Sequence, residues 1–222
     1  MKEVTGLLVM DVDGTLIRQE GIDLLAQEAG VGEKVAEITA QAMNGELDFA
    51  ASLQARVALL KGLETSIFPK IIEQMDVTPG AKTLITELHQ RGYKVGLVSG
   101  GFHEVIDPIA RSLGIDLVRA NRLQTFDGRL TGKVLGEIVT PERKKDNLLT
   151  WARENHIPRS QTIAMGDGAN DLPMIETAGI GIAFMAKPIV AERAPYRIET
   201  SDLSLVLEIL DQHRKETACI SY

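Results

Sequence analysis

Three short polar turns carry the residue types that could do chemistry, and each comes directly after an apolar run. They are Asp11-Val12-Asp13-Gly14-Thr15, Ser99-Gly100-Gly101 and Gly166-Asp167-Gly168-Ala169-Asn170-Asp171. If the runs are neighbouring parallel strands, their carboxyl ends bring these turns to one edge of the sheet, where ligands bind in open α/β folds. Carboxylates gathered there cannot all stay ionised unless a cation holds them. Oxygen ligands favour a hard cation, and Mg²⁺ in particular when phosphate and water complete its shell.

Each turn alone is a weak signal. Asp-x-Asp and Gly-Asp-Gly are common in ordinary turns, and Ser-Gly-Gly suits a loop that needs positive φ. The informative feature is the combination, in this order and with an apolar run before each turn.

The elements that would position these turns follow from hydrophobic patterning. Short continuous apolar runs predict strands buried on both faces of a parallel sheet, at 6–10, 95–98, 162–165 and 180–184. A helix is expected over 81–91, with Leu84, Ile85 and Leu88 on one stripe and Gly92 as its stop. This alternation predicts an α/β protein with a doubly wound, Rossmann-like parallel sheet.

One segment interrupts the alternation. From about residue 20 to residue 76 the pattern is helical without a strand candidate, and Phe49, Leu53, Val57 and Leu60 share one helix face. We therefore expect a small helical cap at 19–76, inserted after the first strand, and an α/β catalytic core made of 1–18 and 77–222. Within that core, 123–134 predicts a hairpin around Asp127-Gly128, and Ser201 is expected to cap a terminal helix.

Composition narrows the class of protein. The chain has 222 residues, a formal net charge of −7 and 44% hydrophobic residues, which is typical of a globular protein and argues against nucleic-acid binding. No apolar stretch reaches the length of a membrane span, and the N-terminal run is cut at Asp11 without a signal cleavage site. With Cys219 as the only cysteine, no intramolecular disulfide is possible. We expect a cytoplasmic protein with no nucleic-acid or membrane partner, either monomeric or homodimeric.

As a set, the motifs resemble those of the haloacid dehalogenase-like phosphatases. The first motif corresponds to 11–15, the second to Ser99, the third to Lys144 and the fourth to 166–171. Within this superfamily the similarity is to the phosphoserine phosphatases, through 20–23, 98–102, 120–123 and 182–188, and it extends from about Leu7 to Leu210. Gly14 departs from the usual Ser. The run Arg143-Lys144-Lys145 leaves two lysines for the third motif, of which spacing favours Lys144.

The resemblance implies a Mg²⁺-dependent hydrolase that converts O-phosphoserine to serine and phosphate, the last step of serine biosynthesis. Asp11 would be the nucleophile, forming an aspartyl-phosphate, and Asp13 the general acid and base. Asp11 is expected to stay ionised beside the metal, whereas Asp13 titrates higher. The metal would be held by Asp11, the Asp13 carbonyl, Asp167 and Asp171, the last of which could instead orient Lys144.

The resemblance also assigns the remaining contacts. Lys144, Ser99 and the Gly100 N–H would hold the phosphoryl oxygens, Glu20 would bind the substrate ammonium, and Arg56 its carboxylate. Further contacts are expected from residues around the substrate: Met43, Phe49 and Asn170. From the pattern alone, Arg56 is more simply a solvated helix residue and Met43 plain core. A cap that opens and closes is expected, because water must be excluded during attack and admitted for hydrolysis.

Three other functions fit parts of this pattern. Another small-molecule phosphatase of the same superfamily, or a phosphotransferase that passes the phosphoryl group from phosphoserine to homoserine, would share the motifs. A response-regulator-like receiver also places Asp, Ser or Thr, and Lys at strand ends, but it lacks a dedicated general acid such as Asp13.

Overall fold

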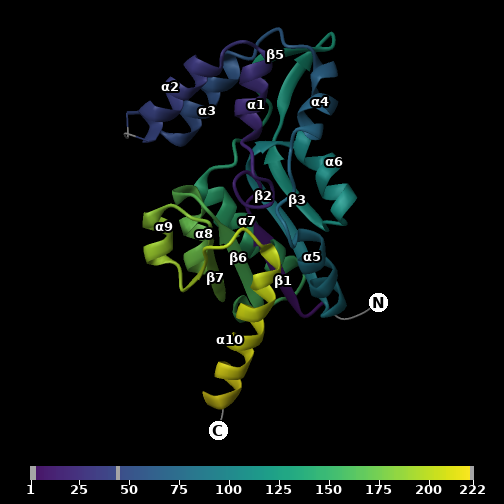
Figure 1. Cartoon of the computed structure of the whole chain (residues 1–222), viewed down its shortest axis with the longest axis vertical. Helices are drawn as coiled ribbons and strands as arrows, with labels where there is room; N and C mark the ends of the chain where they lie inside the picture. The colour runs from purple at the N-terminus through teal and green to yellow at the C-terminus, as the bar shows by residue number, and fades with distance from the viewer. Residues whose placement is uncertain (1–3, 44–45, 221–222) are drawn as a thin grey trace.

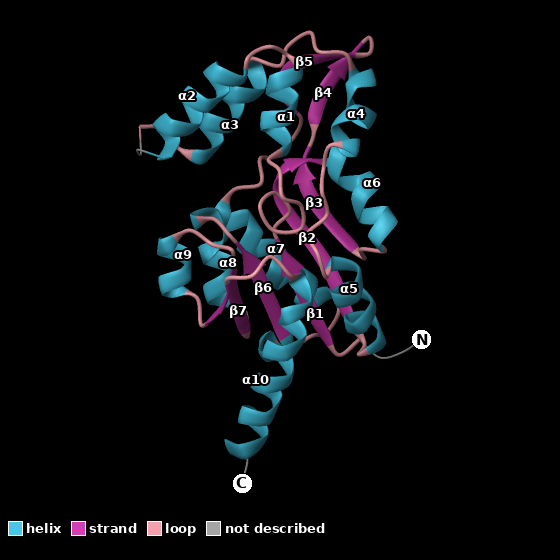
Figure 2. Cartoon of the chain, in the orientation of Figure 1, coloured by secondary structure: helices cyan, strands magenta, loops and turns pink. Residues whose placement is uncertain are grey.

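The computed structural model describes residues 4–43 and 46–220, with side chains at 4–42 and 46–216. Helices surround a central sheet (Figures 1 and 2). The strands are β1 Gly6–Met10, β2 Tyr93–Phe102, β3 Leu117–Asn121, β4 Leu123–Phe126, β5 Arg129–Val134, β6 Thr162–Gly166, β7 Ile180–Phe184 and β8 Tyr196–Ile198. The α-helices are α1 Gly21–Glu28, α2 Gly32–Met43, α3 Phe49–Ala58, α4 Phe68–Glu73, α5 Ala81–Gln90, α6 His103–Leu113, α7 Pro141–Glu154, α8 Leu172–Thr177, α9 Pro188–Arg193 and α10 Val206–Ile220.

The main sheet is parallel throughout its six strands, in the order β3-β2-β1-β6-β7-β8. The chain runs outward from β1 to β3 and then returns to the other side of β1 for β6. The strand order therefore reverses beside β1, and the carboxyl ends of β1, β2 and β6 meet at this switch point, where α/β sheets place their ligands. The doubly wound fold predicted from the sequence is confirmed.

Strand β1 is apolar throughout because both of its faces are covered. Leu7 and Val9 pack in one cluster with residues of α7 and α8, whereas Leu8 and Met10 belong to the larger cluster on the opposite face, with residues of α5, α6 and α10. All five residues of β1 are buried. A strand without a polar side produces the continuous apolar run seen in the sequence.

The sequence patterns missed two strands and misplaced one cap. Strands β3 and β8 lie at the two edges of the sheet, and each carries an exposed arginine, Arg119 and Arg197. Neither therefore shows a continuous apolar run. Ser201 does not cap the terminal helical segment. Asp202 precedes its first turn, at Leu203–Leu205, and its side chain accepts a hydrogen bond from the Ser204 N–H at 2.9 Å.

The helices α1 to α4 are inserted between β1 and α5, as the sequence predicted. The two segments that lead into and out of this insertion lie side by side. Ile17 pairs with Val77, and the Thr78 hydroxyl donates to the Thr15 carbonyl at 2.7 Å. Domain boundaries after residues 18 and 76 stay a prediction.

The β4–β5 hairpin packs against the inserted helices rather than against the main sheet (Figure 1). The Gly62 N–H, just after α3, donates to the Leu130 carbonyl at 2.8 Å, and the Leu130 N–H donates to the Leu63 carbonyl at 2.9 Å. Within the described residues, none of the helices has the length and apolarity that crossing a bilayer requires.

Candidate active site

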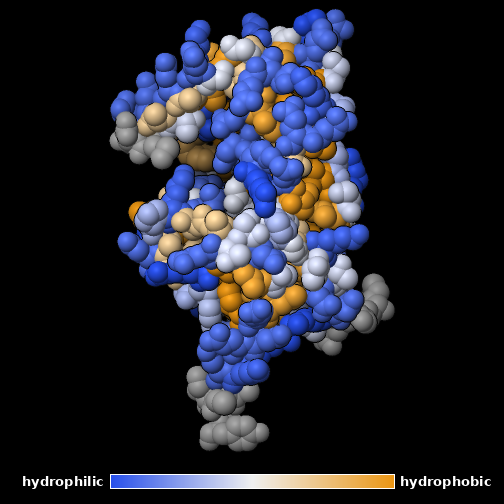
Figure 3. Space-filling model, viewed as in Figure 1, coloured by the Kyte–Doolittle hydropathy of each residue, from blue (hydrophilic) through white to orange (hydrophobic). Residues whose placement is uncertain are grey.

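A cleft of about 410 Å³ lies between the inserted helices and the switch point of the sheet. Figure 3 shows the surface hollowed where α2 and α3 face α8 and α9. The turn after β1, the carboxyl end of β2 and the loop after β6 form its floor. Helices α1, α2 and α3 contribute its roof. The main residues of the lining are Asp11, Asp13, Glu20, Asp23, Thr39, Phe49, Ser52, Arg56, Gly100, Gly101, Asp167, Asn170 and Lys187.

Asp11 occupies the position directly after β1, with only 5% of its surface exposed. Its backbone N–H continues the sheet by donating to the Met165 carbonyl at 3.0 Å. The Val12 N–H donates to Oδ1 of the carboxylate at 2.7 Å, and the Lys144 ammonium lies 2.8 Å from Oδ2. The end of the central strand therefore holds a buried carboxylate with both oxygens oriented.

Lys144 projects from the first turns of α7, whose N-cap is Thr140. Its side chain is fully buried, and Nζ contacts Oδ1 of Asp171 at 2.7 Å as well as Asp11. Burial alone would lower the pKa of Lys144, but the carboxylates of Asp11 and Asp171 outweigh it and raise the pKa. Lys145, the alternative lysine, makes no such contact among the described residues. The structure brings Lys144 to the site.

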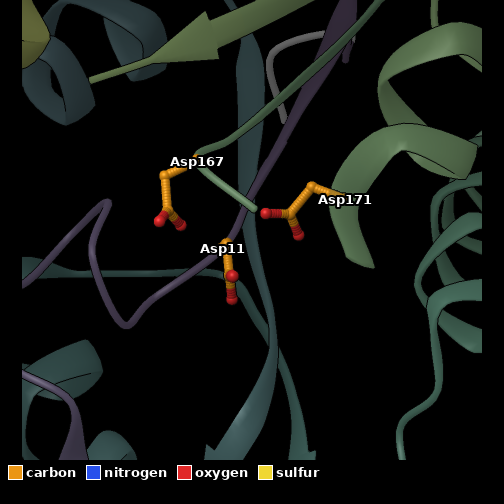
Figure 4. Close-up of side chains that lie close together, drawn as sticks. All are labelled: Asp11, Asp167 and Asp171. Atoms are coloured by element: carbon orange, nitrogen blue, oxygen red, sulfur yellow. The ribbon is translucent and has the colours of Figure 1, made fainter. Parts of the chain in front are cut away.

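Three carboxylates of the site lie close enough to share a cation. Asp11, Asp167 and Asp171 each offer an oxygen, and these atoms all lie within 4.8 Å of one another. Figure 4 shows Asp11, directly after β1, beside the two residues of the segment that follows β6. A side chain at position 14 would collide with this cluster, because a Cβ at Gly14 would lie 2.9 Å from Cγ of Asp167. An oxygen-only donor set in this arrangement fits a hard metal ion.

The charges of this cluster are not balanced by the protein alone. Burial and then the charge of Asp11 raise the pKa of Asp167 to about 6. The same two causes raise the pKa of Asp171 to about 7, against the opposing effect of Lys144. One lysine does not neutralise three carboxylates, of which Asp11 and Asp171 are buried, so near neutral pH the cluster must take up protons or a cation.

Asp13 is half-buried at the edge of the cleft, and both of its oxygens are hydrogen bonded. The Gly21 N–H donates to Oδ1 at 2.7 Å, and the Ser99 hydroxyl donates to Oδ2 at 3.1 Å. Burial, followed by the charge of Asp11, raises its pKa to about 6. A carboxyl group with this pKa exchanges protons near neutrality, which agrees with the expectation that Asp13 titrates high.

The turn predicted at Ser99-Gly100-Gly101 is instead the last part of β2, which continues to Phe102; Gly100 lines the cleft there, and the Ser99 side chain is buried. Asn121, which is buried at the end of β3, fixes this end of β2 by donating from Nδ2 to the Gly100 carbonyl at 2.8 Å. Oδ1 of Asn121 accepts from the Val139 N–H at 2.8 Å, next to the start of α7. Phe49 of α3 packs over Gly100 in β2, since a Cβ at Gly100 would lie only 3.0 Å from its ring. The inserted helices thus reach the floor of the cleft.

Glu20 and Arg56 face the cleft from the inserted segment. The Arg56 Nε donates to the Ser52 carbonyl at 3.3 Å within α3. Burial in the cleft, followed by the charges of Asp13 and Asp11, raises the pKa of Glu20, although part of the side chain stays exposed to solvent. A carboxyl group and a guanidinium placed together across from the Asp cluster can bind the two ends of an amino acid.

Of the other residues expected at the site, Phe49, Gly100 and Asn170 line the cleft. The side chain of Met43 lies outside the described part of the chain. Sequence reasoning did not select Asp23 or Lys187, which also line the cleft. Asp23 lies three residues after Glu20, on the first turn of α1, and this spacing is the signal that could have selected it.

Known proteins resemble this chain in both sequence and fold. The model of the haloacid dehalogenase-like hydrolase family matches residues 8–176. A phosphoserine phosphatase of Streptococcus thermophilus is 63% identical over 212 residues, covering 96% of this chain and 99% of its own. Two solved structures superpose with a TM-score of 0.87, each covering 92% of this chain and 98% of theirs. One is a phospho-aspartyl intermediate analogue of phosphoserine phosphatase, 45% identical, and the other a substrate-bound phosphoserine phosphatase complex, 44% identical.

Proposed function

The chain belongs to the haloacid dehalogenase-like hydrolase family, and we propose that it is a magnesium-dependent phosphatase that hydrolyses O-phosphoserine to serine and phosphate. The observation that carries this proposal is one cleft that holds both the Asp11–Asp13 pair and the Glu20–Arg56 pair. The first pair suits transfer of a phosphoryl group, and the second suits an amino acid. The close relatives that act on phosphoserine support the same substrate.

Asp11 is the nucleophile. One of its carboxylate oxygens attacks phosphorus, the bond from phosphorus to the serine oxygen breaks, and an aspartyl-phosphate forms. The Val12 N–H and Lys144 keep both oxygens in fixed positions before the attack, so little reorganisation is needed. The phospho-aspartyl analogue of the relative with 45% identity supports this intermediate.

Asp13 manages the proton in both half-reactions. In its neutral form it protonates the serine oxygen as that oxygen leaves phosphorus, and the resulting carboxylate then accepts a proton from the water that attacks the aspartyl-phosphate. A pKa of about 6 lets both forms exist near neutral pH. The Ser99 hydroxyl donates to Asp13 in this structure, and it would exchange this acceptor for a phosphoryl oxygen when the substrate binds.

Asp11, Asp167 and Asp171 are the side chains that would hold Mg²⁺, together with the Asp13 carbonyl. When bound, the ion supplies positive charge that offsets the charge of the phosphoryl oxygens. The contact of Asp171 with Lys144 gives it a further role, because it keeps the ammonium beside the nucleophile. Lys144, the Ser99 hydroxyl and the Gly100 N–H bind the remaining phosphoryl oxygens.

The inserted helices select the substrate. Arg56 binds the carboxylate of phosphoserine with its planar guanidinium, and Glu20 binds the ammonium. Phe49 and Gly100 enclose the short serine side chain between α3 and the carboxyl end of β2, while Asn170 and Met43 complete the walls. A cytoplasmic location and a monomeric or homodimeric state are part of the same proposal.

The test is phosphate release from phosphoserine, phosphothreonine and a sugar phosphate, compared side by side in the presence of Mg²⁺. We expect phosphoserine to be the best substrate and the Asp11→Asn variant to release no phosphate above background. Phosphoserine turnover no faster than that of Asp11→Asn would contradict the proposal. Adding homoserine separates hydrolysis from transfer, since a phosphotransferase would form phosphohomoserine at the expense of free phosphate.

A further inference from the structure

The Asn121 side chain holds β2 at the point where its pairing with β3 is interrupted. Val98 pairs with Arg119 and Phe102 with Asn121, so the register between the two strands shifts over the residues in between. Asn121 is only 1% exposed, and its Nδ2 donates to the Gly100 carbonyl at 2.8 Å. A side-chain amide therefore replaces a hydrogen bond of the strand ladder at the end of β2 that reaches the cleft.

The orientation of the Asn121 amide follows from its partners. A carbonyl oxygen only accepts and a backbone N–H only donates, so Nδ2 faces Gly100 and Oδ1 faces the Val139 N–H, which lies 2.8 Å away. Val139 directly precedes Thr140, the N-cap of α7, and the Thr140 carbonyl accepts from the Lys144 N–H at 3.0 Å. Asn121 thus connects the end of β2 with the helical turn that carries Lys144.

The hydrogen bonds continue from Gly100 to the Ser99 hydroxyl. The Gly101 N–H belongs to the same peptide group as the Gly100 carbonyl, and it donates to Oγ of Ser99 at 2.8 Å. From Val139 to Ser99, each amide accepts at one end and donates at the other in the same direction, so successive bonds polarise one another. Because the Ser99 oxygen accepts at the end of this chain, its own O–H is directed away from Gly101, and Asp13 accepts it at 3.1 Å.

We infer that Asn121 is a positioning residue, which holds the Ser99 and Gly100 donors in place relative to Lys144. This inference rests on the proposed phosphatase function, in which those three groups bind phosphoryl oxygens. Asn121 is not among the described residues that line the cleft, so it acts through its neighbours. Phosphoryl transfer depends on donors that are in place before the reaction begins. Loosening this connection therefore lowers the rate of the chemical step more than it lowers the affinity for the amino-acid part of the substrate.

Asn121→Leu removes both hydrogen bonds of the side chain and keeps its branched shape. The matched control is Thr162→Val. Thr162 is also 1% exposed, and its hydroxyl also bridges two backbone groups, donating to the Arg159 carbonyl at 2.6 Å and accepting from the Gly179 N–H at 3.1 Å. It is the first residue of β6, at the end of the strand away from the cleft. Both variants replace a buried bridging group by an apolar one of similar shape, so both should lose stability, and only Asn121→Leu should alter the reaction.

The readout separates the phosphoryl end of the site from the amino-acid end. Orthovanadate, which adopts the trigonal-bipyramidal geometry of phosphoryl transfer, probes the first end, and L-serine, as a competitive inhibitor, probes the second. With Mg²⁺ present, we expect Asn121→Leu to lower kcat for phosphoserine and to raise the inhibition constant of orthovanadate, each by about tenfold or more. The inhibition constant of L-serine should stay close to that of the wild type. Thr162→Val should keep all three constants.

Equal weakening of both inhibitors, or orthovanadate inhibition unchanged from wild type, would overturn the inference, and so would the same kinetic losses in Thr162→Val. If Asn121→Leu does not fold, the Asn121 side-chain amide can be followed by NMR in the wild-type protein. Its resonances should shift when orthovanadate binds. The reference is the side-chain amide of Asn155, which donates to the Trp151 carbonyl at 2.8 Å just beyond the last turn of α7 and should not shift. An Asn121 amide that also stays unshifted would overturn the inference.

Failure of the proposed function is a different result, namely a wild-type protein that does not turn over phosphoserine. The orthovanadate comparison does not need that substrate. Calorimetric binding of orthovanadate to the wild type and to Asn121→Leu tests the inference directly: weaker binding to the variant supports it, and equal binding overturns it.

Discussion

Replacing Lys144 by methionine is expected to destabilise the protein strongly, because the lysine is the buried counter-ion of two carboxylates. Its side chain has 0% exposure, and its nitrogen lies 2.8 Å from Asp11 and 2.7 Å from Asp171. Methionine keeps most of the length and apolar volume of the stem but removes the charge. The variant therefore isolates the loss of the ammonium from the creation of a cavity.

The size of the effect follows from what remains behind. Removing one partner of a buried ion pair costs about 3–5 kcal/mol, since the other charge stays in the interior uncompensated. For a protein of about 150–250 residues, each kcal/mol lowers the Tm by about 2–4 °C, so Lys144→Met should lose about 6–20 °C. Adding Asp171→Asn removes one of the orphaned charges and should recover about 0.5–3 kcal/mol, the usual range of coupling between residues in contact.

The stability lost on replacing Lys144 by methionine should depend on pH, and the direction of this dependence follows from the pKa of Asp171. The pKa of Asp171 is already raised to about 7, above the ordinary carboxyl value of 3.8, and without Lys144 it rises further. A carboxyl group whose pKa is higher in the folded state costs stability at high pH and regains it as the pH falls through the folded pKa. Lys144→Met should therefore lose much more stability at pH 8 than at pH 5.5.

The assay is urea unfolding of the wild type, both single variants and the double variant at these two pH values, with a chelator present so that bound metal does not contribute. A loss below about 1 kcal/mol for Lys144→Met at pH 8 would refute the reasoning. A loss of the same size at pH 5.5 would refute it as well. Either result would mean that water or structural relaxation compensates the two carboxylates.

Three further predictions concern the substrate carboxylate, the packing of Phe49 over Gly100 and the metal. Arg56→Lys should raise KM for phosphoserine about tenfold or more. It should change KM little for phosphoethanolamine, because that substrate has no carboxylate for the planar guanidinium to bind. Steady-state kinetics on the two substrates checks this. Gly100→Ala should lower kcat/KM, since its Cβ would lie 3.0 Å from the Phe49 ring, and adding Phe49→Leu should restore part of the loss. Without metal, the pKa of Asp167, raised to about 6, should make the protein less stable as the pH rises from 5 to 8, so Mg²⁺ should raise the Tm more at pH 8 than at pH 5.

The sequence predicted the interior of the fold better than its edges. The four central strands are buried on both faces and appear as apolar runs, whereas β8 is only three residues long and includes the exposed Arg197. Its place in the sheet depends on pairing with β7, a long-range contact that local periodicity does not encode. The hairpin was visible in the sequence, but its packing against α3 and the segment that follows α3 was not, since that depends on hydrogen bonds across about 70 residues of chain.

For the site as well, residue types and spacing predicted some features, and others depend on the fold. The Asp11–Asp13 pair and the turn at 166–171 could be selected by residue type, and spacing favoured Lys144 over Lys145, with which the contacts of Lys144 agree. The Gly21 N–H could not be found in this way, because every residue except proline has a backbone donor and only the fold shows where it points. Its partner Asp13 was selected for its own chemistry, and nothing in the pattern indicated which group would orient it.

The net negative charge of the chain is compatible with an anionic substrate when the charges within the cleft are considered together. Around Asp11, burial raises the pKa of Asp13, Asp167 and Asp171 to between about 6 and 7, although Lys144 lies among them. Burial is the main cause of these raised pKa values, and the charge of Asp11 adds to it. Carboxylates this close together favour a divalent cation over a second ammonium, because one ion adds two charges in a small volume. The surplus of carboxylates thus creates the affinity for a cation, and the cation makes the cleft attractive to a phosphate. On this reasoning, metal binding must precede binding of the phosphate ester.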